Sequence, residues 1–195
     1  IDLEDLIKKR DVVILTTNTG YIKRMDLDTY QTQNRGGKGL KGMATKDEDY
    51  VVDLFTCSSH DYILFFTSGG RVFWMKGYNI PSGTRQSKGK ALVNMLPHLE
   101  PGETIRSRIT VPGSDESRYL MFVTRNGTIK RTPLISYSRP RSKGIRALLL
   151  EEDDELVDTA VCGADDEVVL STAMGMANRF KVSDVRSMGR IAYGV

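Results

Sequence analysis

Residues 33–39 read Gln-Asn-Arg-Gly-Gly-Lys-Gly and combine three glycines with two cationic side chains. Glycines let the backbone approach a ligand closely and turn its N–H groups outward as an anion-binding nest, while Arg35 and Lys38 supply positive charge. Phosphate is the ligand that such a loop suits best. The loop is not a nucleotide-binding P-loop, because that motif needs Ser or Thr after its Lys and here Gly39 follows.

Catalytic chemistry has little support elsewhere in the chain. His60 and His98 are the only histidines, and neither has cysteine or carboxylate neighbours at the spacing of a metal site. No serine-elbow motif is present. We therefore expect no catalytic centre, no metal and no cofactor in this chain.

Charge is unevenly distributed, although the formal net charge is only +3. Residues 125–146 contain seven basic residues and no acidic one, whereas residues 151–167 contain nine acidic residues and no basic one. This segregation predicts one positive and one negative face. With 39% hydrophobic residues the chain can bury a core, as a globular protein does.

The cysteines and the hydropathy bear on the cellular setting. Cys57 and Cys162 lie far apart in apolar stretches, which favours buried reduced thiols and a cytoplasmic setting. The first ten residues lack the apolar core of a signal peptide, and no apolar run approaches the ~20 residues of a membrane span. We expect neither export nor membrane insertion. The chain starts without Met and stops at Val195 in mid-pattern, which is typical of a piece of a longer protein.

Four stretches follow one plan, in which an apolar run, a glycine turn, a second apolar run and a basic glycine loop succeed one another. The turn glycines need a positive φ, and the pairs Asn126-Gly127 and Gly69-Gly70 are strong signals for tight hairpins. A second glycine follows each turn glycine by 19, 19, 17 and 14 residues, so the last repeat is expected to be the shortest. The turn glycines are Gly20, Gly70, Gly127 and Gly175, and the second glycines are Gly39, Gly89, Gly144 and Gly189.

Strand-like runs between the hairpins give each repeat about four strands. These runs cover residues 51–57, 104–111 and 156–162, whereas a helical turn or two is expected only within residues 2–9. We expect a single all-β domain over residues 1–195, with repeats at about 11–61, 62–118, 119–166 and 167–195. Units of about 50 residues should stack as propeller-like blades. A β-sandwich with coincidental turns is the alternative, but sandwiches do not repeat a glycine motif in register.

Basic residues recur in the hairpins and in the glycine loops, which predicts a curved stripe that binds and bends duplex DNA through its phosphates. An alternative is that these side chains only protect strand edges from aggregation. That alternative explains poorly why Arg24, Arg131 and Arg179 share one offset from the turn glycine, with Trp74 as the exception. The residues expected to contact DNA are Lys23, Arg24, Gln33, Asn34, Arg35, Gly36, Gly37, Lys38, Gly39, Lys41, Arg85, Lys88, Lys130, Arg131, Arg139, Arg141, Lys143, Arg179 and Arg186.

Segment 33–39 resembles the Q-R-R-G-G-K-G box of the C-terminal domain of the DNA gyrase A subunit, with six of seven positions matching. The opening residues 2–7, the four degenerate repeats and the hairpin strand 71–76 are also similar to that domain, so the resemblance covers the whole chain. Asn34 departs from the box, because it stands where the family has Arg. The family usually has six blades, whereas four are recognised here.

The resemblance implies a β-pinwheel of four-stranded antiparallel blades, about four of them present. It implies a rim that wraps duplex DNA with positive handedness and supports ATP-dependent negative supercoiling. The implied partners are double-stranded DNA, the rest of the gyrase A subunit, and the gyrase B subunit in an A2B2 complex. The strand-cleaving tyrosine of the family belongs to another domain, so Tyr21, Tyr30 and Tyr137 are expected to be structural or rim residues.

Two other functions stay open. One is a topoisomerase IV type module, which binds and orients DNA without strong wrapping. The other is a β-propeller that recognises proteins. The box favours gyrase over topoisomerase IV, whose box is degenerate or absent, and the basic hairpins disfavour a protein-binding disc.

Overall fold

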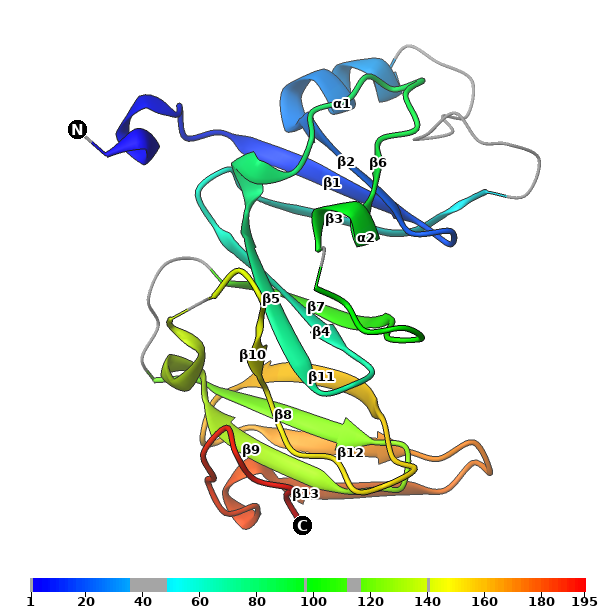
Figure 1. Ribbon diagram of the computed structural model, residues 1–195, viewed down its shortest axis with the longest axis vertical. Coiled ribbons are helices and arrows are strands. Elements are labelled where there is room, and N and C mark those ends of the chain that lie inside the picture. Colours follow the sequence, from blue (N-terminus) through cyan, green and yellow to red (C-terminus); the bar gives the residue numbers. More distant parts are fainter. Residues whose placement is uncertain (1, 36–48, 97, 112–116, 140) are drawn as a thin grey trace. The chain divides into compact units, whose positions relative to one another are not determined.

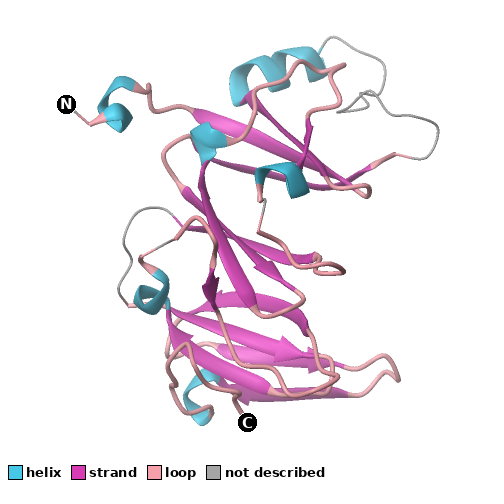
Figure 2. Ribbon diagram, in the orientation of Figure 1, coloured by secondary structure: helices cyan, strands magenta, loops and turns pink. Residues whose placement is uncertain are grey.

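Strands are the predominant secondary structure of the protein (Figure 2), which confirms the expected all-β class. The computed structural model describes residues 2–35, 49–96, 98–111, 117–139 and 141–195, with the backbone alone at 34 and 35. The chain divides into two compact units, one made of Ile1–Ile63 and Met75–Leu99, the other of Leu64–Trp74 and Glu100–Val195.

The first unit contains one four-stranded antiparallel sheet in the order β3-β1-β2-β6. Its apolar side chains pack in a cluster around Val13, Leu15 and Met25, because alternate residues of a strand share a face. The strands are β1 (Asp11–Thr17), β2 (Tyr21–Asp26), β3 (Val51–Ser58) and β6 (Lys90–Ala91).

The second unit contains three sheets, in the orders β10-β5-β4-β7, β11-β8-β9 and β12-β13. Aromatic rings link the first two of these sheets, since Phe66 and Phe122 meet edge to face at 5.4 Å. The strands are β4 (Tyr62–Thr67), β5 (Arg71–Lys76), β7 (Ile105–Val111), β8 (Tyr119–Thr124), β9 (Ile129–Pro133), β10 (Ile145–Arg146), β11 (Leu156–Cys162), β12 (Glu167–Ser171) and β13 (Ala177–Lys181).

A repeat supplies the last strand of the sheet before it. The hairpin strand β2 pairs with β6, and β5 pairs with β10, so the last strand of these two sheets comes from much later in the chain. At β9 the same place is taken by Val195, which exchanges two backbone hydrogen bonds of 2.7 and 2.8 Å with Ile129. The sheets of the first three hairpins are therefore each completed by the segment that follows the next hairpin, whereas β12 and β13 pair only with each other among the described residues.

All four hairpins turn through the same motif, Thr-x-x-Gly. The glycines Gly20, Gly70, Gly127 and Gly175 have φ between +80° and +85°, which confirms the predicted positive φ. Each glycine N–H donates to the threonine carbonyl at 3.0 Å, and the threonine hydroxyl accepts the N–H of the residue after the glycine. Because neither Gly69 nor Asn126 has a positive φ, the turns are of type I followed by one left-handed residue.

Two helices were not expected from the sequence, α1 (Leu27–Arg35) and α2 (Leu92–Met95). Helix α1 follows β2 directly (Figure 1), and its Leu27 and Tyr30 pack on the cluster of the first sheet. Residues 33–35 thus form the last turn of a helix, which corrects the predicted loop at these positions. With two apolar residues, three apart, α1 has too weak a periodicity to be found from sequence. The 3-10 turns are Leu3–Leu6, Gly77–Asn79, Leu134–Tyr137 and Val182–Asp184.

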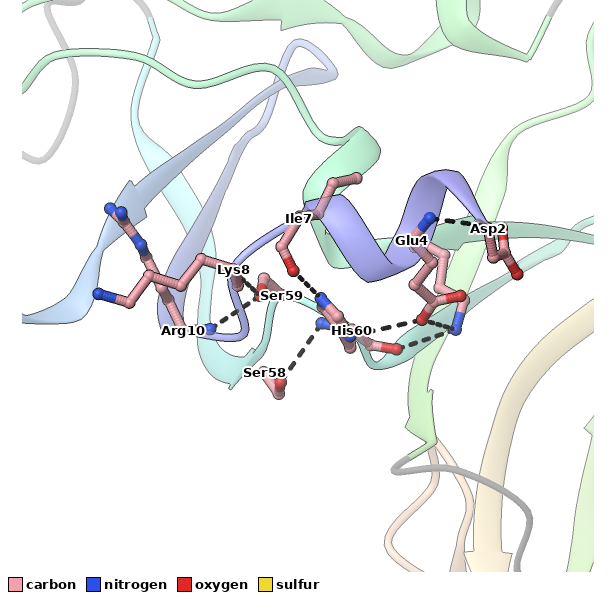
Figure 3. A network of polar contacts seen from close by, with 9 residues as sticks. Asp2, Glu4, Ile7, Lys8, Arg10, Ser58, Ser59 and His60 are labelled. Carbon is pink, nitrogen blue, oxygen red and sulfur yellow. Dashed lines mark hydrogen bonds and ion pairs between the residues drawn. The ribbon is translucent and has the colours of Figure 1, made fainter.

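The N-terminal turn Leu3–Leu6 confirms the short helical segment expected at residues 2–9 and is held by polar contacts (Figure 3). The His60 imidazole lies between two of its groups, with Nε2 at 2.7 Å from the Ile7 carbonyl and Nδ1 at 3.5 Å from the Glu4 carboxylate. Lys76 Nζ lies 3.1 Å from the same carboxylate. These contacts fix the chain entering β1.

Both cysteines are buried free thiols, as predicted. Trp74 is half-buried, whereas Tyr137 is buried and its hydroxyl donates to the Ala147 carbonyl at 2.7 Å. Within the residues that the structure describes, no helix combines the length and the apolar character needed to cross a membrane.

Candidate nucleic-acid interface

The glycine-rich segment begins at the end of helix α1. Gly36, Gly37, Lys38, Gly39 and Lys41 lie outside the described residues, and for Asn34 and Arg35 only the helical backbone is described. Gln33 is half-buried in the last turn of α1. The predicted anion contact of this segment therefore stays a prediction.

A cavity of about 580 Å³ lies in the first unit where the glycine-rich segment begins. Gln33 lines it together with the basic residues Lys8, Arg10 and Arg24. Arg10 is paired with Asp26 at 3.1 Å, so part of the positive charge on this wall is already neutralised. Lys8 and Arg24 form no ion pair with a described residue, which leaves the cavity wall cationic on balance.

Lys23 and Lys130 do not lie on the surface, which corrects their predicted role as direct DNA contacts. Both side chains are fully buried, and burial lowers the pKa of each to about 8. Their ammonium groups donate to backbone carbonyls, of Thr84, Arg85 and Ser87 for Lys23. The three carbonyls use all the donors of Lys23, and Lys130, which donates to the carbonyls of Ala147 and Arg190, is fully buried away from any phosphate.

Arg24, Arg131 and Arg179, which stand four residues after their turn glycines, are exposed to different degrees and already have partners. Arg24 Nε donates to the Ile80 carbonyl at 2.9 Å, and the Arg131 guanidinium lies over the Tyr119 ring at 4.5 Å. Arg179 is 70% exposed but is paired with Glu167. Each of these arginines thus already has an intramolecular partner, and their contact with DNA stays a prediction.

The loops after the hairpins carry several basic residues that have no acidic partner. Arg139, Arg141, Lys143 and Arg186 are exposed, Arg85 is half-exposed, and none of them forms an ion pair with a described residue. Lys88 differs, since its Nζ lies 3.8 Å from Asp49 and 3.9 Å from the centre of the Tyr21 ring. Basic residues without an acidic partner among the described residues therefore recur in loops 84–89, 139–144 and 186–190.

Glycines end the loops at 84–89 and 139–144, where the chain approaches the preceding hairpin. Gly89 and Gly144 have φ of +82° and +73°. A Cβ at Gly89 would lie 2.3 Å from the Ile22 carbonyl oxygen, and one at Gly144 would lie 2.9 Å from the ring of Phe73. Only glycine allows this close approach together with this backbone conformation.

The corresponding glycine of the fourth repeat is Gly194, not the predicted Gly189. Gly194 has φ of +105°, and a Cβ there would lie 2.4 Å from the Ile129 carbonyl oxygen, whereas Gly189 has open space around it and no positive φ. Gly194 follows Gly175 by 19 residues, the same interval that separates Gly70 from Gly89. The glycine interval of the fourth repeat is therefore not shortened, and the sequence signal was the 19-residue interval that the second repeat also has.

A metal centre has no basis in the described part of the chain, where no group of three or more His, Cys, Asp or Glu residues could hold an ion. His60 is engaged by the N-terminal turn, and both cysteines are separately buried. The basic loops can bind a polyanion electrostatically.

Comparison with known proteins assigns the chain to a family. A family model described as "DNA gyrase C-terminal domain, beta-propeller" matches residues 11–58, 61–107, 118–162 and 166–195. The DNA gyrase A subunit of Clostridium acetobutylicum is 44% identical over 195 residues, which is all of this chain and 23% of that protein. The DNA gyrase A subunit of Halalkalibacterium halodurans is 46% identical over 192 residues, or 98% of this chain and 23% of that protein. The chain thus spans about a quarter of the length of these curated relatives.

Two solved structures have the same fold. The C-terminal domain of DNA topoisomerase IV superposes with a TM-score of 0.81 and 30% identity, covering 97% of this chain and 57% of that one. The DNA gyrase A C-terminal domain superposes with a TM-score of 0.69 and 23% identity, covering 95% of this chain and 59% of that one.

Sheets built on a repeated hairpin, completed by later strands and followed by basic loops, define a β-pinwheel, the propeller-like class predicted from the sequence. Within that class, the chain belongs to the DNA gyrase C-terminal domain family. This assignment confirms the resemblance drawn from residues 33–39.

Proposed function

We propose that the chain is the DNA-wrapping domain of a DNA gyrase A subunit, with no active site of its own. It binds double-stranded DNA on its basic loops and wraps it with positive handedness. In the assembled enzyme this wrap supports ATP-dependent negative supercoiling. The observation that supports the proposal most strongly is that the loops at 84–89, 139–144 and 186–190 each carry at least one exposed or half-exposed basic residue that forms no ion pair with a described residue.

Such loops suit the DNA backbone for a physical reason. Each basic side chain that neutralises a phosphate releases a counterion, so several contacts give strong binding that needs no base sequence and weakens steeply with salt. Bending a 20–30 base-pair site costs on the order of 1–6 kcal/mol, which several loops together can offset. We extend the proposal to the residues of the glycine-rich box, Gln33 to Gly39 with Lys41, and to Arg24, Lys88, Arg131 and Arg179 as weaker contacts.

The proposal includes the setting of the domain. It treats residues 1–195 as one domain of four repeats, joined to the rest of the gyrase A subunit. Two such A chains assemble with two gyrase B chains as an A2B2 complex in the cytoplasm. The topoisomerase activity then belongs to the whole enzyme.

A topoisomerase IV type module is the second candidate, because the solved topoisomerase IV domain superposes with the higher TM-score, 0.81. That module is expected to bind DNA without strong wrapping. The box at residues 33–39 favours gyrase, and a protein-binding propeller finds no support in basic loops that lack acidic partners.

The test is a topoisomer assay in which relaxed, nicked plasmid is incubated with the chain, religated and analysed for linking number. We expect a positive shift. Replacing Arg35 and Lys38 by Ala should reduce the shift more than DNA affinity, because the remaining loops still attract phosphates. Salt-sensitive binding with no shift would favour the topoisomerase IV type module, and equal loss of both would contradict a special role for the box.

A further inference from the structure

Lys23 connects two repeats through one ammonium group. Its side chain projects from β2, is fully buried, and donates to the carbonyls of Thr84 at 2.8 Å, Arg85 at 3.0 Å and Ser87 at 3.0 Å. An ammonium has three protons, so these three bonds use all of its donors. A single side chain of the first repeat therefore fixes the backbone of a loop in the second repeat.

The loop that Lys23 holds is one of the exposed basic loops. It carries Arg85, which forms no ion pair with a described residue, and it is closed on β2 by two further contacts. The N–H of Gly83 donates to the Arg24 carbonyl at 3.0 Å, and Gly89 lies against the carbonyl of Ile22. The conformation in which Arg85 is presented is thus set by groups of the preceding hairpin.

The same device recurs in the second unit. Lys130 stands three residues after its turn glycine, as Lys23 does, and donates to the carbonyls of Ala147 at 2.8 Å and Arg190 at 3.0 Å. Arg190 ends the basic loop that carries Arg186. Phe73 holds the corresponding position of the second repeat and meets Gly144 by ring contact instead. In the first three repeats, the side chain three residues after the turn glycine contacts the following loop, and in two of them that side chain is a lysine.

We propose that Lys23 is a positioning residue for DNA, which strengthens binding by holding loop 84–89 in the conformation that presents Arg85 to a phosphate. This inference rests on the proposed function. Lys23 itself touches no DNA, so its replacement acts only through the loop that it anchors.

The test is a double-mutant cycle read by the salt dependence of DNA binding, well below the unfolding temperature. The slope of log K against log salt is negative, and each lost phosphate contact reduces its magnitude by about one. Arg85→Ala should reduce this magnitude by that amount, and Lys23→Met should do the same although Lys23 is buried. The double variant should lose no more than either single variant, because both remove one contact. Lys9→Met removes an exposed charge outside the predicted contacts and serves as the control.

A second readout follows the loop without DNA. Trypsin should cut after Arg85 at least several-fold faster in Lys23→Met than in the parent chain or in Lys9→Met. Unchanged cleavage would overturn the anchoring role. Additive losses in the cycle, or a normal slope in Lys23→Met, would overturn the positioning role. A parent chain that fails to bind DNA would instead overturn the proposed function, and with it the contribution of Lys23 to binding.

Discussion

The Glu103 carboxylate accepts hydrogen bonds from four directions and is only 5% exposed. Thr67 Oγ1 donates at 2.5 Å, Arg71 donates from Nε at 3.1 Å and from Nη2 at 2.5 Å, and the N–H of Glu100 donates at 2.9 Å. Burial alone would raise the pKa of Glu103, but these donors outweigh it and hold the pKa below its ordinary value. The group therefore stabilises the turn between β4 and β5 as an anion.

Glu103→Gln should lower the free energy of unfolding by about 2 kcal/mol at pH 7, because it leaves Arg71 without its buried partner. Since the folded pKa is lowered, the contribution of Glu103 is present above the ordinary carboxyl pKa and is lost as pH falls through the folded value. Urea unfolding at pH 7 and pH 3 measures this. A gap between parent and variant that stays constant in acid would refute it.

The pKa of Lys130 is also lowered in the folded state, so its effect on stability has the same sign of pH dependence as that of Glu103 but falls in a higher pH range. Burial, and secondarily the charge of Arg190, lowers its pKa to about 8, so the folded state releases its proton before the unfolded state does. Between that pKa and the ordinary lysine value the unfolded chain binds more protons, and the free energy of unfolding increases with pH.

Relative to Lys130→Met, the parent chain should gain about 2 kcal/mol between pH 8 and pH 10. Chemical denaturation across this range measures the difference, with Lys9→Met as the control that keeps the parent's pH dependence. Parallel curves for the parent and Lys130→Met would show that the buried amine does not titrate in this window.

Residue types predicted the presence of basic side chains but not their exposure. Lys23, Lys130, Arg139 and Arg141 are equivalent in a charge count, yet two are buried and two exposed. The difference arises because β2 and β9 are covered by loops from the following repeat, a long-range contact that no local pattern records.

At the scale of elements, hairpins were predictable because their turns need a left-handed glycine and their strands are apolar. The runs expected at 51–57 and 156–162 coincide with β3 and β11 within a residue. The two-residue strands β6 and β10 were not predictable, since they exist only by pairing with a distant hairpin. Helix α1, mostly polar, was missed for want of periodicity.

Gly194→Ala should be clearly more destabilising than Gly189→Ala. At Gly194 a Cβ would meet the Ile129 carbonyl oxygen at 2.4 Å with φ of +105°, whereas at Gly189 it would enter open space. We expect a loss of about 1 kcal/mol or more for Gly194→Ala and little change for Gly189→Ala. Thermal unfolding, with hydrogen exchange at the Ile129 amide, measures both. Equal effects of the two substitutions would contradict the assignment of Gly194 as the glycine that corresponds to Gly89 and Gly144.

For the whole molecule, DNA affinity is expected to depend on loops more than on hairpins. The triple variant Arg139→Ala, Arg141→Ala and Lys143→Ala should reduce the magnitude of the negative slope of log K against log salt by about three. Each of the three residues is exposed and lacks an acidic partner among described residues. Arg179→Ala should reduce this magnitude by less than one, because Arg179 must first leave Glu167. Filter binding at several salt concentrations compares the two. A larger effect for Arg179→Ala would contradict the assignment to loops.

Family and fold were predictable for the molecule as a whole, since a seven-residue box and a repeated glycine are both local in sequence. The order of strands was not, because it depends on which repeat supplies the closing strand.

The completion of one repeat's sheet by a segment of the next repeat also affects how the protein unfolds. When the segment that includes β10 detaches, the β4–β5 sheet loses an edge, and when residues around Val195 detach, β9 does. A sheet of this kind cannot melt alone, because its own loss exposes hydrogen-bonding groups on its neighbour. Nearest-neighbour coupling of this sort makes the unfolding of successive repeats cooperative within a compact unit. Strain in a loop of one repeat therefore lowers the stability of the repeat before it.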